Sequence, residues 1–307
     1  MFLIIQIENL TKEFGSIRAV DNITLNIDEG EVFGFLGPNG AGKTTTIRML
    51  SCLISKTSGQ ANIGDYSIAN KLDQPKIRRM IGLLTENVGL YEDLSAYKNL
   101  DFFGRYYKCS TTQRKERIEY YLKELGLWDK RNAVVGSFSK GMKQKIALVR
   151  ALIHDPQLLF LDEPTANLDP EAAKTVLDLI IDLKKEKRTI LLNTHLLDEA
   201  QRICDRICIL KTKMIAVDAP KKLMESLSGK KTVIRLSFVN DSIVNAIKKA
   251  GNWNVEINNN KIFINVIDPE NENPIIADAI VSAGGKLQSM SVVTSSLEDV
   301  YLNYVKR

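Results

Sequence analysis

The sequence predicts an α/β protein whose first domain contains a parallel β-sheet. Residues 31–36 and 157–163 form compact apolar runs, which are typical of strands buried on both faces of such a sheet. Residues 44–54 and 171–188 have the periodicity of helices. Because strand-like and helical segments alternate along the chain, the pattern predicts parallel strands joined by helices.

Two further segments complete the expected first domain. Residues 2–10 and 22–28 alternate between apolar and polar side chains, as half-buried strands do. The pattern from residue 86 to residue 151 is almost wholly helical, so we expect a helical subdomain at about 87–151. Six aromatic residues recur there at near-helical spacing, and we interpret them as core that packs these helices rather than as a ligand cage. They are Tyr91, Tyr97, Phe102, Phe103, Tyr106 and Tyr107.

The pattern changes after residue 231, where a smaller α+β domain is expected. Strand-like and helical segments follow one another in the order βαββαβ, which fits a ferredoxin-like split βαβ unit. We expect a domain boundary near Gly229, with domains at 3–229 and 230–307. The expected elements are strand 232–238, helix 241–251, hairpin strands 253–257 and 261–267, helix 272–283, strand 286–292 and helix 296–305.

Charge and hydropathy limit the classes of function. The chain has 307 residues and a net charge of +5, and residues 231–307 hold eight basic and eight acidic side chains, so the whole excess lies in residues 1–230. The basic residues there are spread out and do not form the patch with interleaved aromatics of a nucleic-acid binder, so no nucleic-acid partner is expected. No basic leader and no run of roughly 18 apolar residues is present. We therefore expect a cytoplasmic protein, with any membrane span supplied by another polypeptide.

A phosphate-binding loop is the first chemical motif. The pattern G-x-x-x-x-G-K-[ST] lies directly after the strand at 31–36 and directly before a helix, as its mechanism requires. Its glycines allow backbone N–H groups and the helix N-terminus to approach a phosphate chain. Lys43 is expected to hold the β- and γ-phosphates, and the Thr44 hydroxyl to hold Mg²⁺. The motif comprises Gly37, Pro38, Asn39, Gly40, Ala41, Gly42, Lys43 and Thr44, with Thr45 next to it.

Two carboxylates end the apolar strand at 157–163. Asp162 is placed to bind Mg²⁺, often through water, and Glu163 to polarise an attacking water as a general base. Acidic residues at strand ends are often solvated caps, and this pair alone does not distinguish the two roles. Together with the phosphate loop it favours the functional role, and these two elements are compatible with any P-loop ATPase or kinase.

The remaining motifs carry a family resemblance. The segment from Phe138 to Met142, written FSKGM, approximates the LSGGQ signature, and it is followed by LLFLDEP, by the segment 166–169 and by His195. In this order and spacing, residues 3 to 225 resemble the nucleotide-binding subunit of ABC transporters. The resemblance implies a P-loop NTPase of the ABC type with a helical subdomain, which binds and hydrolyses ATP.

The resemblance also implies a head-to-tail dimer of two copies of the chain. Ser139 and Gly141 would close on the ATP held by Lys43 of the other copy, and a serine at a helix N-terminus suits an anion. Asp169 would cross the dimer interface and link the two sites. A helix cap is the structural role of Ser139 and is compatible with this one.

Three further positions correspond to residues that contact nucleotide or metal in the family. His195 resembles the switch histidine that contacts the γ-phosphate and orients the attacking water, whereas we interpret His154 as structural. Phe14 would stack on adenine, with a place in the apolar core as the alternative. Glu86 stands where most members have glutamine, so its contacts to nucleotide and Mg²⁺ are expected in altered form.

The C-terminal segment indicates which branch of the family the chain resembles. SLEDVYLNYVKR at 296–307 resembles the closing segment of ATPase subunits from ABC-2 exporters. The resemblance implies ATP-driven export of an unidentified substrate through a separate integral-membrane permease, with this chain peripheral on the inner face of the membrane. The C-terminal domain would be a dimerisation or regulatory module. The alternative is a non-transport ABC ATPase acting on ribosomes or DNA, a class that usually carries two ATPase domains, long coiled coils or basic insertions.

Overall fold

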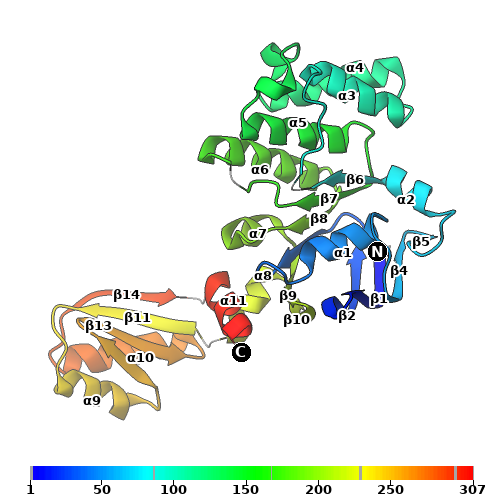
Figure 1. The fold of residues 1–307 in the computed structure, drawn as a ribbon. Coiled ribbons are helices and arrows are strands. Elements are labelled where there is room, and N and C mark those ends of the chain that lie inside the picture. Colours follow the sequence, from blue (N-terminus) through cyan, green and yellow to red (C-terminus); the bar gives the residue numbers. More distant parts are fainter. Residues whose placement is uncertain (1–2, 86, 167, 228–229, 294–295, 307) are drawn as a thin grey trace. The chain divides into compact units, whose positions relative to one another are not determined.

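The computed structural model describes residues 3–85, 87–166, 168–227, 230–293 and 296–306. The chain forms two compact units, Met1–Ala219 and Pro220–Arg307 (Figure 1). In the described part of the chain, no helix combines the length and the apolar character that a membrane crossing needs. Each unit has its own apolar core and is described by itself.

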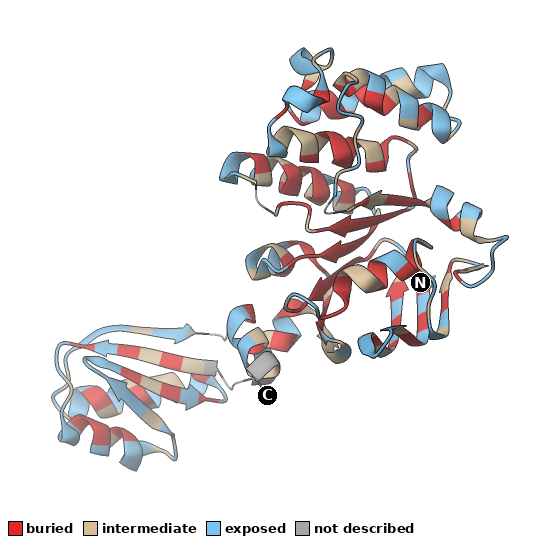
Figure 2. Cartoon of the chain, in the orientation of Figure 1, coloured by how far each residue is buried: buried red, intermediate tan, exposed pale blue. Residues whose placement is uncertain are grey.

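A six-stranded sheet organises the first unit. Its order is β10-β9-β3-β8-β7-β6, and every neighbouring pair is parallel except β10 with β9. Strands β3, β7 and β8 are buried along their whole length, as the red ribbon in Figure 2 shows. The predicted α/β fold is confirmed. The strands are β3 (Val32–Leu36), β6 (Ile81–Leu84), β7 (Leu158–Asp162), β8 (Thr189–Asn193), β9 (Arg206–Lys211) and β10 (Lys213–Asp218).

A second, antiparallel sheet in this unit was not predicted as a sheet. It has the order β2-β1-β4-β5 and contains β1 (Leu3–Phe14), β2 (Ile17–Asp28), β4 (Ser58–Ile63) and β5 (Tyr66–Ser67). The half-buried alternation of residues 2–10 and 22–28 is its sequence signal. Helix α1 (Lys43–Leu50) contacts β2, β4 and β7, so the helix after the phosphate loop packs against both sheets.

The helical region expected at 87–151 contains α3, α4 and α5, which contact one another. Side-chain caps explain where these three begin, since Ser95, Ser110 and Ser139 each accept a hydrogen bond from the first turn of a helix. Besides α1, the first unit contains α2 (Gln74–Met80), α3 (Ala96–Tyr106), α4 (Thr111–Glu124), α5 (Lys140–Leu152), α6 (Pro170–Lys185) and α7 (Leu197–Ile203).

The aromatic residues of the helical region are partly on the surface, which corrects their interpretation as core. Tyr91, Phe102 and Tyr106 are 49%, 44% and 72% exposed. Tyr91 and Phe102 contact each other edge to face, with ring centroids 5.0 Å apart. The buried face of α3 is instead formed by smaller residues at helical spacing, whereas Phe102 and Tyr106 lie on the surface. These smaller residues are Ala96, Asn99, Leu100 and Gly104.

The second unit contains a four-stranded antiparallel sheet of order β12-β13-β11-β14. Helices α9 and α10 contribute Ile243, Ile247, Ile276 and Ile280 to its buried core. The ferredoxin-like assignment is our interpretation of this strand order. The elements are α8 (Pro220–Leu227), β11 (Lys230–Leu236), α9 (Asp241–Ala250), β12 (Val255–Asn258), β13 (Lys261–Val266), α10 (Pro269–Ser282), β14 (Leu287–Val293) and α11 (Leu297–Lys306).

The second unit begins ten residues before the expected start at residue 230. Helix α8 contacts the final helix α11, and it therefore belongs with the C-terminal unit. Leu223 of α8 and both Leu297 and Val300 of α11 are buried. A boundary judged from the change in sequence pattern near Gly229 missed this pairing, because the two helices are far apart along the chain.

Candidate functional site

The residues that follow three buried strands lie at one edge of the parallel sheet. β8 lies between β3 and β7, and all three run in the same direction, so their carboxyl ends are neighbours. A cleft of about 610 Å³ opens at this edge. The lining comes from the start of β2, the phosphate loop with α1, and the ends of β7 and β8. It consists of Ile17, Arg18, Ala19, residues 39–45, Arg48, Asp162, Glu163, Ala166, Asn193, His195 and Thr212.

Two glycines allow the phosphate loop to pack backbone against backbone. Gly42 has φ +94°, and a Cβ built there would lie 2.4 Å from the Ala19 carbonyl oxygen. A Cβ at Gly37 would lie 2.3 Å from the Leu210 carbonyl oxygen. Only glycine fits such approaches, so the loop is held against β2 and β9 and α1 begins immediately after it.

Lys43 is buried, with its ammonium held by the loop itself. Nζ donates hydrogen bonds to the carbonyl oxygens of Gly37 at 2.7 Å and Pro38 at 3.1 Å. Burial lowers the pKa of Lys43, although the negative charges of Glu163 and Asp162 oppose this shift. A phosphate oxygen is a stronger acceptor than a backbone carbonyl, so the arrangement suits an anion in the cleft.

Asp162 lies among polar side chains from two other elements. Thr44 Oγ1 donates to Asp162 Oδ1 at 3.1 Å, and the side-chain amide of Asn193 donates to the same oxygen. Burial raises the pKa of Asp162, and the hydrogen bonds from Thr44 and Asn193 oppose this rise. The cluster joins the phosphate loop, β7 and β8.

Asn193 was not predicted as a site residue. Its Oδ1 is buried and has no hydrogen-bond partner in the described residues. Its sequence signal is weak, because it is one polar residue near the end of the apolar run TILLNT. Its place beside Asp162 follows only from the position of β8 between β3 and β7 in the sheet.

Glu163 and His195 form a hydrogen-bonded pair. His195 Nδ1 and Glu163 Oε2 lie 2.8 Å apart. Glu163 has φ +53°, a left-handed backbone that costs a residue with a side chain about 1–2 kcal/mol. Its N–H donates to the Asn193 carbonyl oxygen at 2.8 Å, which holds this turn in place. Strain of this kind is often found at functional sites.

Several predicted nucleotide contacts lie outside the cleft lining. Phe14 ends β1, is 50% exposed and has Lys12 Nζ 4.8 Å from its ring centroid. Ile17, Arg18 and Ala19 line the cleft near it instead. Gly37 and Pro38 take part through their carbonyl oxygens. Glu86 lies outside the described residues.

Ser139, Gly141 and Asp169 form a second group, which is not among the lining of the chain's own cleft in the described part. Ser139 caps α5 by accepting from Met142 N at 3.2 Å, and Asp169 caps α6 by accepting from Ala172 N at 2.9 Å. A Cβ built at Gly141 would lie 3.8 Å from the Asp169 carboxylate. The signature segment and Asp169 are therefore neighbours.

Gln144 was also missed by the sequence analysis. It lies on α5 and is 6% exposed, and its Nε2 donates to the Pro164 carbonyl oxygen at 3.1 Å. Pro164 directly follows Glu163. The signature helix is thus tied to the segment that carries the proposed base, a link that no local pattern reveals.

Comparisons with known proteins agree with this geometry. A model of the ABC transporter family matches residues 20–166. The chain is 33% identical to the linearmycin resistance ATP-binding protein of Bacillus subtilis, covering 99% of this chain and 98% of that protein. It is 35% identical to the bacitracin transport ATP-binding protein of Bacillus licheniformis, again covering 99% and 98%.

A solved structure shares the fold of the first unit. It is the dimeric, post-hydrolysis state of an ATP-binding cassette bound to ADP and phosphate, with a TM-score of 0.65 and 28% identity, and the match covers 70% of this chain and 98% of that one. Identity of 33% to 35% along nearly the whole chain, together with this fold, shows the family. The chain belongs to the ABC transporter family, as an ATP-binding subunit that hydrolyses ATP.

Proposed function

We propose that the chain uses ATP hydrolysis to drive export through a separate membrane permease, whose substrate this chain does not determine. The observation that carries the ATPase part is the meeting of Lys43, Asp162 and the Glu163–His195 pair at one sheet edge. The export part is supported by the relatives, which are named for bacitracin transport and linearmycin resistance. We place the chain on the inner face of the membrane, where cellular ATP is available.

Thr44 and Asp162 fit a Mg²⁺ ion. Their Oγ1 and Oδ1 atoms lie 3.1 Å apart, and oxygen atoms of these types are the ligands that Mg²⁺ prefers. Burial raises the pKa of Asp162, and a cation beside this carboxylate would favour its charged form. The ion would neutralise charge on the phosphates. Glu86, also expected as a ligand, lies outside the described residues.

Glu163 is the proposed general base, and His195 is proposed to contact the γ-phosphate and orient the attacking water, with the Glu163 carboxylate as its hydrogen-bond partner. The left-handed turn at Glu163 and its 2.8 Å contact to His195 Nδ1 fix the direction of the carboxylate. A base positioned in this way accelerates proton transfer from water by about 10²–10⁴-fold. Lys43 holds the phosphates while Glu163 takes the proton.

A second copy of the chain is the proposed partner that completes the site. Ser139, Gly141 and Asp169 lie together, away from the lining of their own cleft. The N-terminus of α5, capped by Ser139, provides backbone N–H groups for an anion. In a head-to-tail dimer this group faces the partner's ATP, and the similar cassette structure is itself dimeric.

The permease is proposed to contact residues 86–100 and the aromatic residues beside them. Tyr91 and Phe102 are half exposed and contact each other. Exposed aromatic pairs are common at protein interfaces and uncommon on free surfaces. The C-terminal unit remains a proposed dimerisation or regulatory module.

The export proposal is tested by purification of the tagged chain from detergent-solubilised membranes. We expect a multi-span membrane protein to co-purify with it in stoichiometric amount. A matched Tyr91→Ala, Phe102→Ala variant is expected to lose that protein while it keeps ATP binding. Association with ribosomes or DNA in place of a membrane protein would contradict the proposal.

A further inference from the structure

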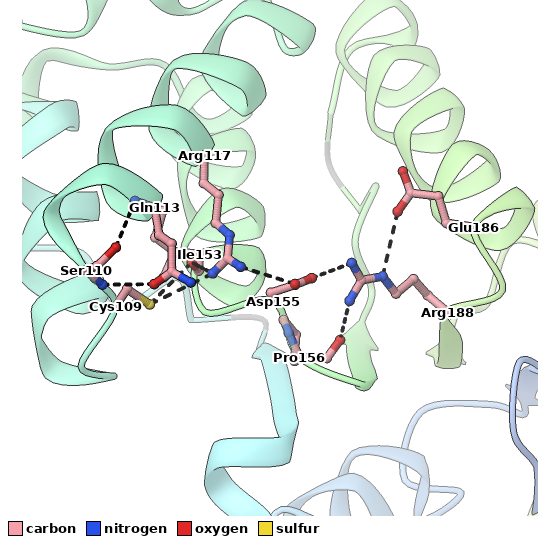
Figure 3. Close-up of polar contacts among 9 residues, drawn as sticks. All are labelled: Cys109, Ser110, Gln113, Arg117, Ile153, Asp155, Pro156, Glu186 and Arg188. Atoms are coloured by element: carbon pink, nitrogen blue, oxygen red, sulfur yellow. Dashed lines mark hydrogen bonds and ion pairs between the residues drawn. The ribbon is translucent and has the colours of Figure 1, made fainter.

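The segment at residues 153–157 connects α5 to β7. Helix α5 begins beside Ser139, and β7 ends at Asp162. The connector is therefore the covalent path from the signature segment to the catalytic carboxylates. Figure 3 shows that polar side chains from other elements converge on this short segment.

Two arginines hold the connector from opposite sides. Arg117 of α4 donates to the Ile153 carbonyl oxygen at 3.1 Å and to Asp155 Oδ2 at 3.1 Å. Arg188, directly before β8, donates to the Pro156 carbonyl oxygen at 2.9 Å and to Asp155 Oδ1 (Figure 3). Each guanidinium thus binds the Asp155 carboxylate and one backbone carbonyl. A planar guanidinium with two such partners fixes direction as well as distance.

The backbone and the charges fit a fixed carboxylate. Asp155 has φ +57°, and its N–H donates to the Leu152 carbonyl oxygen at 2.9 Å. Burial lowers the pKa of Arg188, but the hydrogen bond and charge of Asp155 outweigh this and raise it overall. The Asp155 side chain is 43% exposed, and ion pairs so open to water contribute little to folding stability. The arrangement is better suited to setting an orientation.

His154 holds the same connector on another side. Its Nε2 lies 3.0 Å from the Ile81 carbonyl oxygen at the start of β6, and its ring stacks on Tyr107 with centroids 3.8 Å apart. The connector is thereby attached to β6 and to the end of α3, as well as to α4 and β8.

We propose that Asp155, held by Arg117 and Arg188, is a positioning residue that sets the orientation of the signature helix α5 relative to β7 and β8. This inference rests on the proposed function, in which Ser139 of one copy closes on ATP held by the other. A wrong angle of α5 misplaces Ser139 for the partner while it leaves the chain's own phosphate loop intact. Asp155 therefore controls closure of the dimer and not the binding of ATP to a single chain.

Distance along β8 supports an indirect role. Arg188 precedes the strand and His195 follows it, so they are separated by roughly 20 Å at 3.3 Å per residue. Neither Arg117, Asp155 nor Arg188 lines the cleft in the described part of the chain. The clamp does not touch nucleotide, and any effect on turnover passes through orientation.

The test separates ATP binding from closure. Asp155→Asn keeps the size of the side chain and removes its charge. ATP affinity is measured on dilute chain, and ATP-dependent dimerisation is measured by sedimentation in a Glu163→Gln background. We expect dimerisation to weaken by about three- to tenfold, with ATP affinity unchanged within about twofold. Unchanged dimerisation, or an equal loss of ATP affinity, overturns the proposal.

Two further variants isolate the geometry. Arg117→Lys keeps the positive charge but has no planar fork to bind both Ile153 O and Asp155, so it should remain as defective as Asp155→Asn. Wild-type dimerisation of the Arg117→Lys variant overturns the positioning role. Lys123→Gln, on the same helix, breaks the exposed Lys123–Glu119 pair of 2.6 Å and should behave as wild type. An equal defect in that control also overturns the proposal.

Ser139→Ala, measured beside these variants, distinguishes the two levels of inference. If it dimerises poorly while Asp155→Asn dimerises normally, the positioning role is wrong and the dimer proposal stands. If Ser139→Ala itself dimerises as wild type, the dimer proposal fails and the positioning role fails with it. Thermal unfolding of each variant identifies any that has lost its fold. Where Asp155→Asn or an arginine variant has lost it, the smaller changes Asp155→Glu and Arg188→Lys replace it. Weakened dimerisation with unchanged ATP affinity again supports the proposal, and unchanged dimerisation overturns it.

Discussion

Lys43 is buried and has two backbone carbonyls as its partners, so its ammonium is available to a phosphate that displaces them. We expect Lys43→Ala to weaken ATP binding about 10- to 100-fold, because a hydrogen bond to a charged group contributes about 1.5–3 kcal/mol. Direct titration of nucleotide measures this. Lys71→Ala, an exposed lysine outside the cleft, is the control. Unaltered affinity in Lys43→Ala would contradict the phosphate-binding role.

Glu163→Gln separates binding from hydrolysis. The amide keeps the shape of the side chain but is a poor base, so turnover should fall by about 10²–10⁴-fold while ATP stays bound. With ATP and Mg²⁺ present, the variant should elute as a dimer on sizing. Glu124→Gln, on the exposed face of α4, is the matched control. Wild-type turnover in Glu163→Gln would show that another group is the base.

His154 makes folding stability depend on pH. Burial lowers its pKa to about 4, although its hydrogen bond to the Ile81 carbonyl oxygen opposes the shift. The unfolded chain takes up a proton near pH 6.5, whereas the folded chain does not until about pH 4. Stability is therefore full above pH 6.5 and falls as the pH drops towards 4. The loss from this group between pH 7 and pH 5 is about 2 kcal/mol.

His154→Gln should remove that contribution, so its free energy of unfolding should change less between pH 7 and pH 5 than that of the wild type. Denaturant titration at both values measures the difference. Identical slopes for His154→Gln and wild type would refute the burial argument.

Single residues divide sharply by how far they were predictable. Lys43, Thr44 and Asp162 were predicted because each belongs to a short sequence motif next to an apolar strand. Asn193 and Gln144 were not, because each acquires its role from an element that is distant in sequence. Phe14 was predicted to stack on adenine, whereas Ile17, Arg18 and Ala19 line the cleft near it.

At the level of elements, burial on both faces was the reliable signal. Strands β3 and β7 were expected from compact apolar runs, and both are fully buried. Spacing was a weaker guide for α3, where Phe102 and Tyr106 proved to be exposed. Periodicity shows that residues share a face, but not whether that face meets the core or the solvent.

The hydrogen bond between α5 and the segment that follows β7 can be tested by mutation. Gln144→Leu removes the donor to the Pro164 carbonyl oxygen and leaves that oxygen without this partner. We expect the free energy of unfolding to fall by about 1–3 kcal/mol. Denaturant titration checks it against Gln201→Leu, an exposed position. Equal stability of the two variants would show that the contact contributes nothing.

For the whole molecule, two defective copies should restore each other. Lys43→Ala lacks the phosphate anchor and Ser139→Ala lacks the signature cap, and each is expected to be nearly inactive alone. In a head-to-tail pair, one site draws Lys43 from one copy and Ser139 from the other. Half of the dimers in an equal mixture are mixed, and each holds one intact site of two, so about a quarter of wild-type activity should return.

A steady-state assay of the mixture measures this, with each variant alone at the same total concentration as the control. No recovery would mean that the signature acts on its own chain's nucleotide. Turnover per chain that stays constant on dilution would count against the dimer altogether.

The close contact between Gly42 and the Ala19 carbonyl, described above, has a thermodynamic consequence. Backbone packing holds the loop against β2 in the folded chain, so the conformational entropy of the loop is lost when the chain folds. Association with a triphosphate then needs little further ordering of the backbone. The receptor is preorganised, and a larger side chain at residue 42 would harm recognition even if the fold survived.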